Sequence, residues 1–426
     1  MPDAPDAFDL TIRPAAGDEL DVVARIRARC YRPNYAREHD MRDATRTDRA
    51  DVDAGDMLLT ELDGRVVATT TCLRGEMNVR GSVLPCNGIA WVGTSHDARR
   101  SGGVASKTMH HALGLARERG EVLSALMPFR ASYYEHFGYG LCERRALWTI
   151  PVPILPQAPR GEPPTHRFVE PDDDAMLQTL ADLRRGQFES AALGHGDVAF
   201  PHAAMGGMRH WFDWYTKNGY LFADVGDDGQ TRGWIGVHPV DKPDGRVGLQ
   251  VMHAIYADTI GLVRHLRFLA TLRDQYGYVE IATPADVPLN ALLRESQLPH
   301  RGVQHAHAVC EMAARNQVRV LDHLKLLNTI AWPAGIEGKA TIAIQECEGE
   351  TTKLSLDVSA GRCEATASDA TPAFTCADKT WAPIALGEMT ATFAADAGLA
   401  DCPDRSVLPL LDALSHGPLP FCREFF

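Results

Sequence analysis

The first part of the chain alternates short apolar runs with turn residues, a pattern typical of half-buried strands. A longer stretch with helical periodicity follows, and another apolar run comes directly after it. The predicted elements are strands at residues 57–62, 66–73 and 88–94, a helix at 104–119 and a strand at 122–127. Three strands in an antiparallel arrangement, a helix and a further strand together predict an α/β layer.

The same order of elements recurs between about residues 165 and 310. Strands are predicted at 220–225, 233–238 and 247–257, followed by a helix at 260–275 and a strand at 279–283. The apolar residues of this helix fall along one face. The recurrence predicts two similar units, although the identity between them is too low to establish a duplication.

The boundaries follow from changes in composition. Residues 151–164 contain six prolines, which favour an extended linker between the two units. After Met312 the pattern changes to short strands and short helices, which is typical of a compact α+β domain. The sequence therefore predicts a multidomain α/β and α+β protein with units at 1–150, 151–310 and 311–426.

Composition and charge narrow the classes of function. The chain has 426 residues, with 43 Lys and Arg against 56 Asp and Glu, and a formal net charge of −13. This balance argues against nucleic acid or a membrane as a partner and favours a cationic substrate. The chain has no apolar run of about 18 residues and no signal-like start, so a cytoplasmic location is expected. The ten cysteines lack zinc-ligand spacing, and no metal is expected.

The segment from Gly88 to Gly120 is the most informative. A predicted strand leads into a loop with two arginines and two glycines, and a helix begins at once. The glycines let backbone N–H groups converge, and the helix N-terminus and the arginines add positive charge, so the loop suits a diphosphate. The alternative is that Gly102 and Gly103 only open a helix and the arginines are solvated. The loop alone leaves both interpretations open.

Residues Arg100–Ala105 match R-x-x-G-x-G/A and resemble the coenzyme A pyrophosphate loop of GCN5-related N-acetyltransferases (GNAT). A register that starts at Arg99 is possible, but Arg100 places Met109 and Leu113 on core-facing positions of the helix. In that family the preceding strand also hydrogen-bonds the pantetheine arm. The resemblance implies acetyl-CoA as co-substrate, bound by Val92, Gly93, Thr94, Arg99, Arg100, Gly102, Gly103, Val104 and Ala105.

A tyrosine-rich stretch follows, at the place where chains of this family pass the cofactor thiol. Tyr134 is expected to donate a proton to the departing thiolate, because a phenol with a pKa of about 10 stays protonated at neutral pH. The alternative is that Tyr133, Tyr134 and Tyr139 are packing residues with satisfied hydroxyl groups.

The order of features along nearly the whole chain is more specific. A Y-x-x-F-G-Y-G motif at 134–140, the proline-rich segment, a degenerate second unit and a C-terminal domain resemble the Eis (enhanced intracellular survival) family. The resemblance implies a C-terminal domain similar to sterol carrier protein, a hexamer, and acetylation of aminoglycosides, polyamines or lysine side chains. The second unit is not expected to bind coenzyme A, because Asp258 would repel a pyrophosphate and no arginine replaces the loop arginines.

The Eis family uses its C-terminal carboxylate as general base, so the resemblance assigns this role to Phe426. An α-carboxylate with a reference pKa of roughly 3.3–3.7 stays ionised and can accept a proton. A frayed tail is the alternative, but three phenylalanines in the last six residues favour docking.

The acceptor side is less defined. Glu424 is a candidate contact for a cationic acceptor. Four aspartates could line an acidic mouth, although an exposed helix with internal ion pairs is the stronger interpretation. They are Asp40, Asp43, Asp48 and Asp51. Two rival functions stay open. The first is a non-catalytic protein that binds acyl-CoA or uses its third domain to bind a lipid. The second is an acyltransferase that transfers a longer acyl chain.

Overall fold

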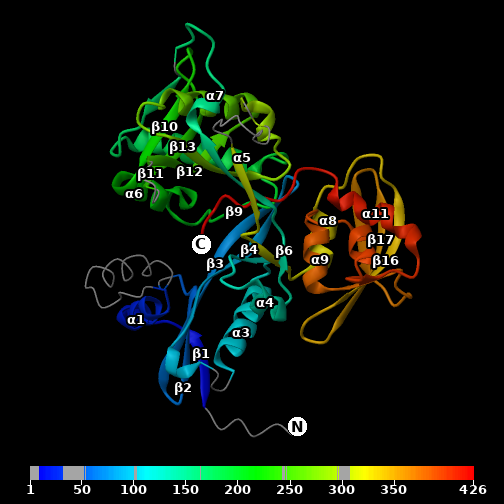
Figure 1. Ribbon diagram of the computed structural model, residues 1–426. Helices are drawn as coiled ribbons and strands as arrows, with labels where there is room; N and C mark the ends of the chain where they lie inside the picture. Colours follow the sequence, from blue (N-terminus) through cyan, green and yellow to red (C-terminus); the bar gives the residue numbers. More distant parts are fainter. Residues whose placement is uncertain are drawn as a thin grey trace.

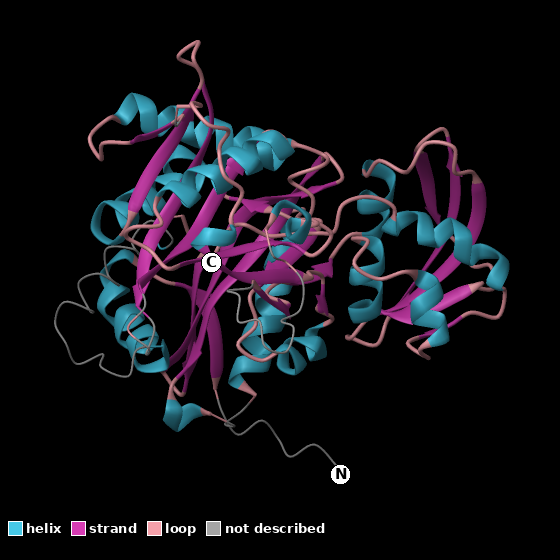
Figure 2. Ribbon diagram, turned by 45° about the horizontal axis from the view of Figure 1, so that its top comes forward, coloured by secondary structure: helices cyan, strands magenta, loops and turns pink. Residues whose placement is uncertain are grey.

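The computed structural model describes residues 9–31, 52, 54–99, 103–163, 165–241, 245, 247–294, 296 and 308–426. Three β-sheets organise these residues, and helices pack against each sheet (Figure 1). The first two sheets form the body of the molecule, and the third, smaller sheet lies to one side (Figure 2). Among the described helices, none combines the length and the apolar character that crossing a bilayer requires.

The first sheet contains the elements predicted for the N-terminal unit. The strand predicted at 57–62 is β2, β2–β3–β4 pair antiparallel as expected, and the predicted helix is α3 (Val104–Glu118). Met109 and Leu113 of α3 are fully buried, as the register starting at Arg100 predicts. In spatial order the strands are β1 (Leu10–Pro14), β2 (Met57–Leu62), β3 (Arg65–Val79), β4 (Ser82–Thr94), β5 (Leu123–Leu126), β15 (Gln317–Val320) and β6 (Gly140–Leu141), and β9 (Val198–Ala199) pairs with β3. The other helices of this unit are α1 (Leu20–Tyr31) and α4 (Ala131–Tyr134).

The second sheet repeats the plan of the first. Its central strands pair antiparallel, and β12 pairs in parallel with β13 across α7 (Thr259–Thr271), the counterpart of α3. In spatial order the strands are β14 (Val309–Ala313), β7 (Arg145–Pro151), β13 (Tyr278–Pro284), β12 (Val247–Tyr256), β11 (Thr231–Asp241), β10 (Tyr220–Val225) and β8 (His166–Phe168). Helices α5 (Asp174–Glu189) and α6 (Met208–Asn218) complete the unit.

Two strands cross the boundaries that the composition suggested. Strand β7 begins at Arg145, before the boundary at residue 150, and pairs with β13 and β14 of the second sheet. Strand β15 follows the boundary at residue 310 but lies between β5 and β6 of the first sheet. Because β15 supplies two ladders of hydrogen bonds, it ties the start of the third unit to the first.

The third sheet carries the rest of the chain. Its core is continuous with that of the first sheet through Val318, Ile342 and Trp381, which are all fully buried. Its strands are β18 (Arg362–Ala367), β17 (Thr351–Ser359), β16 (Gly338–Gln345), β19 (Phe374–Ala377) and β20 (Ala400–Asp401). Its helices are α8 (His323–Thr329), α9 (Asp378–Ala385), α10 (Ala391–Asp396) and α11 (Leu408–Asp412).

Candidate active site

The first sheet opens between two of its central strands. Strands β4 and β5 pair in parallel only as far as Ile89 and Leu126. Strand β4 then continues to Thr94, with a bulge that holds Trp91 at a φ of 53°. Residues 90–94 therefore have no partner in β5. This segment includes the predicted Val92, Gly93 and Thr94.

Tyr31, at the end of α1, also reaches this opening. Its hydroxyl group donates a hydrogen bond to the carbonyl oxygen of Val92, and its ring meets Trp91 edge-on at 5.4 Å. Burial raises the pKa of Tyr31, so the hydroxyl group stays protonated. Sequence reasoning missed Tyr31, because no local motif links it to a strand that lies 61 residues further along the chain.

The predicted diphosphate loop is described in part. Arg99 ends a short 3₁₀ helix, and Gly103 precedes α3 with a left-handed φ of 65° that favours glycine. Because glycine has no side-chain acceptor, the first N–H groups of α3, including those of Val104 and Ala105, receive no cap from it. Such groups suit an anion. Arg100 and Gly102 lie outside the described residues, as do Asp40, Asp43, Asp48 and Asp51.

Tyr134 lies at the end of α4, buried beneath the opening between β4 and β5. It belongs to the apolar cluster that contains Ile89 and Leu126, and its ring packs edge-on against Tyr133 and Tyr139. The Tyr139 hydroxyl group is 2.6 Å from Ser124 Oγ, so that tyrosine is a satisfied packing residue. Burial, and next the neighbouring Tyr31, raise the pKa of Tyr134. Its role as an acid stays a prediction.

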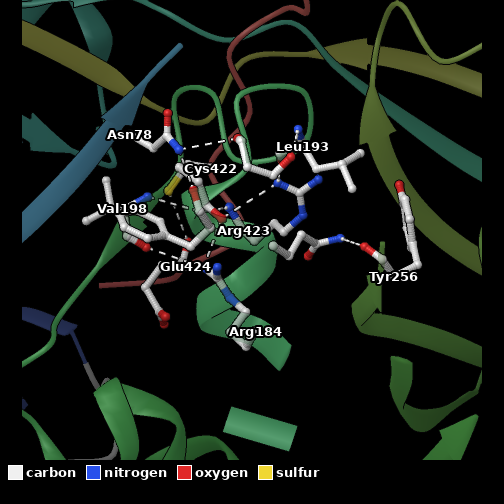
Figure 3. A network of polar contacts seen from close by, with 12 residues as sticks. Asn78, Arg184, Leu193, Val198, Tyr256, Cys422, Arg423 and Glu424 are labelled. Atoms are coloured by element: carbon white, nitrogen blue, oxygen red, sulfur yellow. Dashed lines mark hydrogen bonds and ion pairs between the residues drawn. The ribbon is translucent and has the colours of Figure 1, made fainter. Parts of the chain in front are cut away.

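The C-terminal tail leaves the third unit and ends between the other two (Figure 1). It is not frayed: Phe421 N–H donates to the His195 carbonyl at 2.9 Å, and Arg423 N–H donates to Asp197 Oδ1 at 2.7 Å. Figure 3 shows Cys422, Arg423 and Glu424 within this polar network. The expectation that the tail docks is confirmed.

The last residue lies on the first sheet. The Phe426 ring packs edge-on against Phe200, with ring centroids 5.3 Å apart. Phe200 lies on two glycines of the sheet, since a Cβ added at Gly75 or Gly88 would come within 3.0 or 3.1 Å of its ring. Gly88 directly precedes Ile89, where β4 and β5 stop pairing. The chain end and the opening are therefore neighbours.

Glu424 contacts the second unit. The indole N–H of Trp211 donates to its carboxylate at 2.7 Å, and the side chain is buried. Burial raises the pKa of Glu424, while Arg184 and the hydrogen bond from Trp211 oppose that rise. A buried carboxylate that is already held by an indole is poorly placed to be the main contact of a cationic acceptor.

The corresponding place in the second unit is closed by its own residue. The Asp258 carboxylate accepts a hydrogen bond from Gly261 N–H at 2.8 Å and caps α7. The acidic side chain thus takes the position at the helix N-terminus that an anion would need.

One group of possible metal ligands occurs in the described residues, Cys347, Glu348 and Asp378. The guanidinium group of Arg319 lies among them, 2.6 Å from Glu348 Oε2 and 3.8 Å from Asp378 Oδ2. This cluster therefore already contains a cation from the chain itself.

Comparison with known proteins agrees with this arrangement. Residues 11–142 match the family model described as an acetyltransferase (GNAT) domain. A curated relative, an uncharacterized N-acetyltransferase from Streptomyces avermitilis, is 29% identical over 158 residues. The match spans only 37% of this chain and 37% of the relative.

The whole chain is similar in fold to several solved structures. A GCN5-related N-acetyltransferase from Anabaena variabilis has a TM-score of 0.80 at 17% identity, covering 98% of this chain and all of the other. A GCN5-related N-acetyltransferase from Kribbella flavida has a TM-score of 0.78 at 21% identity, and the match covers 100% of both chains. Eis1 from Mycobacterium abscessus has a TM-score of 0.75 at 18% identity, and the match covers 99% of this chain and 100% of that chain. Residues 11–142 thus match the acetyltransferase (GNAT) domain family, and the whole chain shares the fold of these solved N-acetyltransferases and of Eis1.

Proposed function

We propose that the chain transfers the acetyl group of acetyl-CoA to a cationic primary amine, with the Phe426 α-carboxylate as base and Tyr134 as acid. The observation that carries this proposal is the common position of the two residues. Tyr134 packs with Ile89 on one face of β4, and Phe426 reaches Gly88 through Phe200 on the other. Both lie at the point where β4 and β5 diverge.

The opening suits acetyl-CoA as the acyl donor. A strand edge without a partner offers N–H and C=O groups to the amides of a pantetheine arm, and the start of α3 offers N–H groups to a diphosphate. The donor supplies a thioester carbonyl group for attack. We assign its binding to Val92, Gly93, Thr94, Arg99, Arg100, Gly102, Gly103, Val104 and Ala105.

The two proton-handling groups have different tasks. An ammonium group must lose a proton before its nitrogen can attack a thioester, and an ionised α-carboxylate held nearby can accept that proton. The raised pKa keeps Tyr134 protonated. As the acid, Tyr134 hydrogen-bonds the sulfur as negative charge develops there and shares its phenolic proton with the departing thiolate.

The acceptor class follows from charge. A net charge of −13 attracts cations, which favours an aminoglycoside, a polyamine or a lysine side chain over a neutral amine. We also propose a cytoplasmic hexamer, and a structural role for the third unit in delivering the tail.

The test is thiol release from acetyl-CoA with a panel of polyamines, aminoglycosides and lysine peptides. Two tail variants are compared with the parent: one lacks Phe426, and one has a single glycine added after it. The added glycine keeps every native side chain but moves the carboxylate by one residue. Both should lower kcat by about 10²- to 10⁴-fold, the usual contribution of a general base.

Phe425→Ala is the matched control, because Phe425 is 61% exposed and its replacement leaves the terminal carboxylate in place. It should keep most of the activity. If the extended chain stays folded and turns over as fast as the parent, the carboxylate is not the base. If no amine supports thiol release but an apolar ligand raises the melting temperature, the binding-protein alternative is correct.

A further inference from the structure

The second unit has an opening like that of the first, and the tail of the chain lies in it. Strands β12 and β13 pair in parallel only as far as Val251 and Ile281 and then diverge. A cavity of about 470 Å³ lies there, and three tail residues line it: Phe421, Arg423 and Phe425. The place that corresponds to the opening between β4 and β5 of the first unit is therefore bordered by the protein's own tail.

The peptide groups of Cys422 are held by charged side chains from outside the tail. The Cys422 carbonyl oxygen accepts hydrogen bonds from Arg145 at 2.6 Å and from Arg315 at 2.7 Å. Its N–H group donates to Glu143 Oε1 at 3.2 Å, and Glu143 also pairs with Arg145 at 2.6 Å. Hydrogen bonds to charged groups are stronger than those between neutral groups, so this peptide is firmly fixed.

Arg315 differs from Arg145 in how it uses its guanidinium group. Within the described part of the chain, its guanidinium group donates hydrogen bonds to two tail carbonyl oxygens, those of Cys422 at 2.7 Å and Glu424 at 2.8 Å. Its guanidinium carbon also lies 5.8 Å from the ring centre of Phe425. Burial and the nearby Arg145 lower the pKa of Arg315. The tail carbonyls therefore compensate a charge that is otherwise costly to bury.

Asp197 holds the opposite side of the tail. This carboxylate is fully buried, accepts from Arg423 N–H at 2.7 Å and pairs with Arg184 at 2.9 Å. The last fixed carbonyl is that of Glu424, two residues before the end, and two residues span at most about 7 Å. Any loosening at Glu424 would therefore move the Phe426 carboxylate, and misplacement of a reacting group by about 1 Å can cost 10²-fold in rate.

We propose that the charged groups beside the divergent strand pair of the second unit, chiefly Arg145, Asp197 and Arg315, form the receptor for the chain's own tail, and that Arg315 is the positioning residue that sets where the terminal carboxylate lies. The positioning of a reacting group rests on the function proposed above, but the binding of the tail does not. The second unit then has a task of its own, although Asp258 closes its helix N-terminus to an anion.

The experiment uses Arg315→Gln and Arg315→Lys in the full-length chain. Release of Phe426 by carboxypeptidase A, followed by intact mass, measures docking of the tail without reference to activity. Thiol release gives kcat and the KM for acetyl-CoA. Arg232→Gln is the control, because Arg232 belongs to the second unit, is 47% exposed and pairs only with exposed Asp228 in the described residues.

Arg315→Gln should speed release of Phe426 by roughly ten- to a hundredfold, the equivalent of one or two charge-assisted hydrogen bonds. It should lower kcat and leave the KM for acetyl-CoA within about twofold of the parent. Arg315→Lys, which keeps the charge but not the two-pronged geometry, should fall between the parent and Arg315→Gln. It also provides the test if the glutamine variant does not fold.

The two proposals fail in different ways. If release of Phe426 stays at the parent rate in both Arg315 variants, the receptor proposal is wrong whatever happens to kcat. If release becomes faster but kcat is unchanged, the tail receptor stands, and the role of Phe426 as base is wrong. Faster release together with lower kcat supports both.

Discussion

Phe200 is the contact through which the last residue rests on the first sheet, and its replacement is our main prediction. The Phe200 ring lies on Gly75 and Gly88 and meets the Phe426 ring at an interplanar angle of 80°. Phe200→Ala removes this support but no group that we assign to the chemistry. The Phe426 carboxylate, Tyr134 and the opening between β4 and β5 all remain.

The size of the effect follows from the geometry of this ring pair. An edge-to-face aromatic pair contributes about 0.5–1.5 kcal/mol beyond its buried area. That energy corresponds to roughly a two- to twelvefold change in the equilibrium constant for placing Phe426. Phe200→Ala should therefore lower kcat by at most that factor, far less than the loss expected when the carboxylate is moved. Phe200→Leu keeps part of the apolar contact and should lower kcat less.

A double-mutant cycle makes the test specific. Phe426→Ala keeps the terminal carboxylate but removes the other ring, so the double variant should be little worse than either single variant. Thiol release is measured for all four proteins, with melting temperatures as a control for folding. Strictly additive losses, or a fall in stability of Phe200→Ala without any change in kcat, would show that this ring pair does not place the carboxylate.

Three further predictions concern the tail and the titration of buried groups. Gly196→Ala should lower kcat, because the new Cβ would lie 2.4 Å from the Cβ of Pro420 in the tail, whereas Gly161→Ala, with no atom within 4 Å, should not. Burial raises the pKa of Glu121 to about 7, so its cost to stability is absent below pH 4.5 and complete above pH 7. Glu121→Gln should therefore raise the free energy of unfolding at pH 8, by at most about 3 kcal/mol, and change it little at pH 4.5. Burial, and next the neighbouring imidazole of His265, lower the pKa of His166 to about 3. The protein therefore loses stability as the pH falls below 6.5, because the unfolded chain then binds a proton that the folded protein does not. His166→Phe should lower the melting temperature at pH 7 but reduce its further fall between pH 7 and pH 5, as measured by thermal unfolding.

Periodicity predicted the regular elements well where turns bound an apolar run on both sides. The strands predicted at 57–62 and 220–225 are β2 and β10 with the same bounds. It did not predict β15, a strand of four residues that buries Gln317 and Arg319 fully, because a short segment with polar residues does not show an apolar run. Only tertiary partners on both sides make such a strand stable.

The residues of the candidate site also divide into those that a local sequence motif indicates and those that only the folded chain brings together. The candidate diphosphate loop and Tyr134 could be named from the sequence, because each belongs to a motif whose residues are close together in the sequence. The tail network could not, because Glu143, Asp197 and Arg315 come from three distant segments and meet only around Cys422 and Arg423. A lone charged residue in a sequence gives no indication of which distant peptide group it will bind.

The tail also explains why a main-chain carboxylate would do work that enzymes usually assign to a side chain. Two carboxyl groups lie within its last three residues, and their surroundings separate them. Glu424 is buried, takes the Trp211 hydrogen bond and has a raised pKa, so it is committed to holding the tail. The terminal carboxylate has an intrinsically low pKa, and its place is set by the number of residues beyond the last fixed carbonyl. The position of this proposed base therefore depends on chain length, which is why adding one glycine should affect catalysis more than replacing a neighbouring exposed side chain.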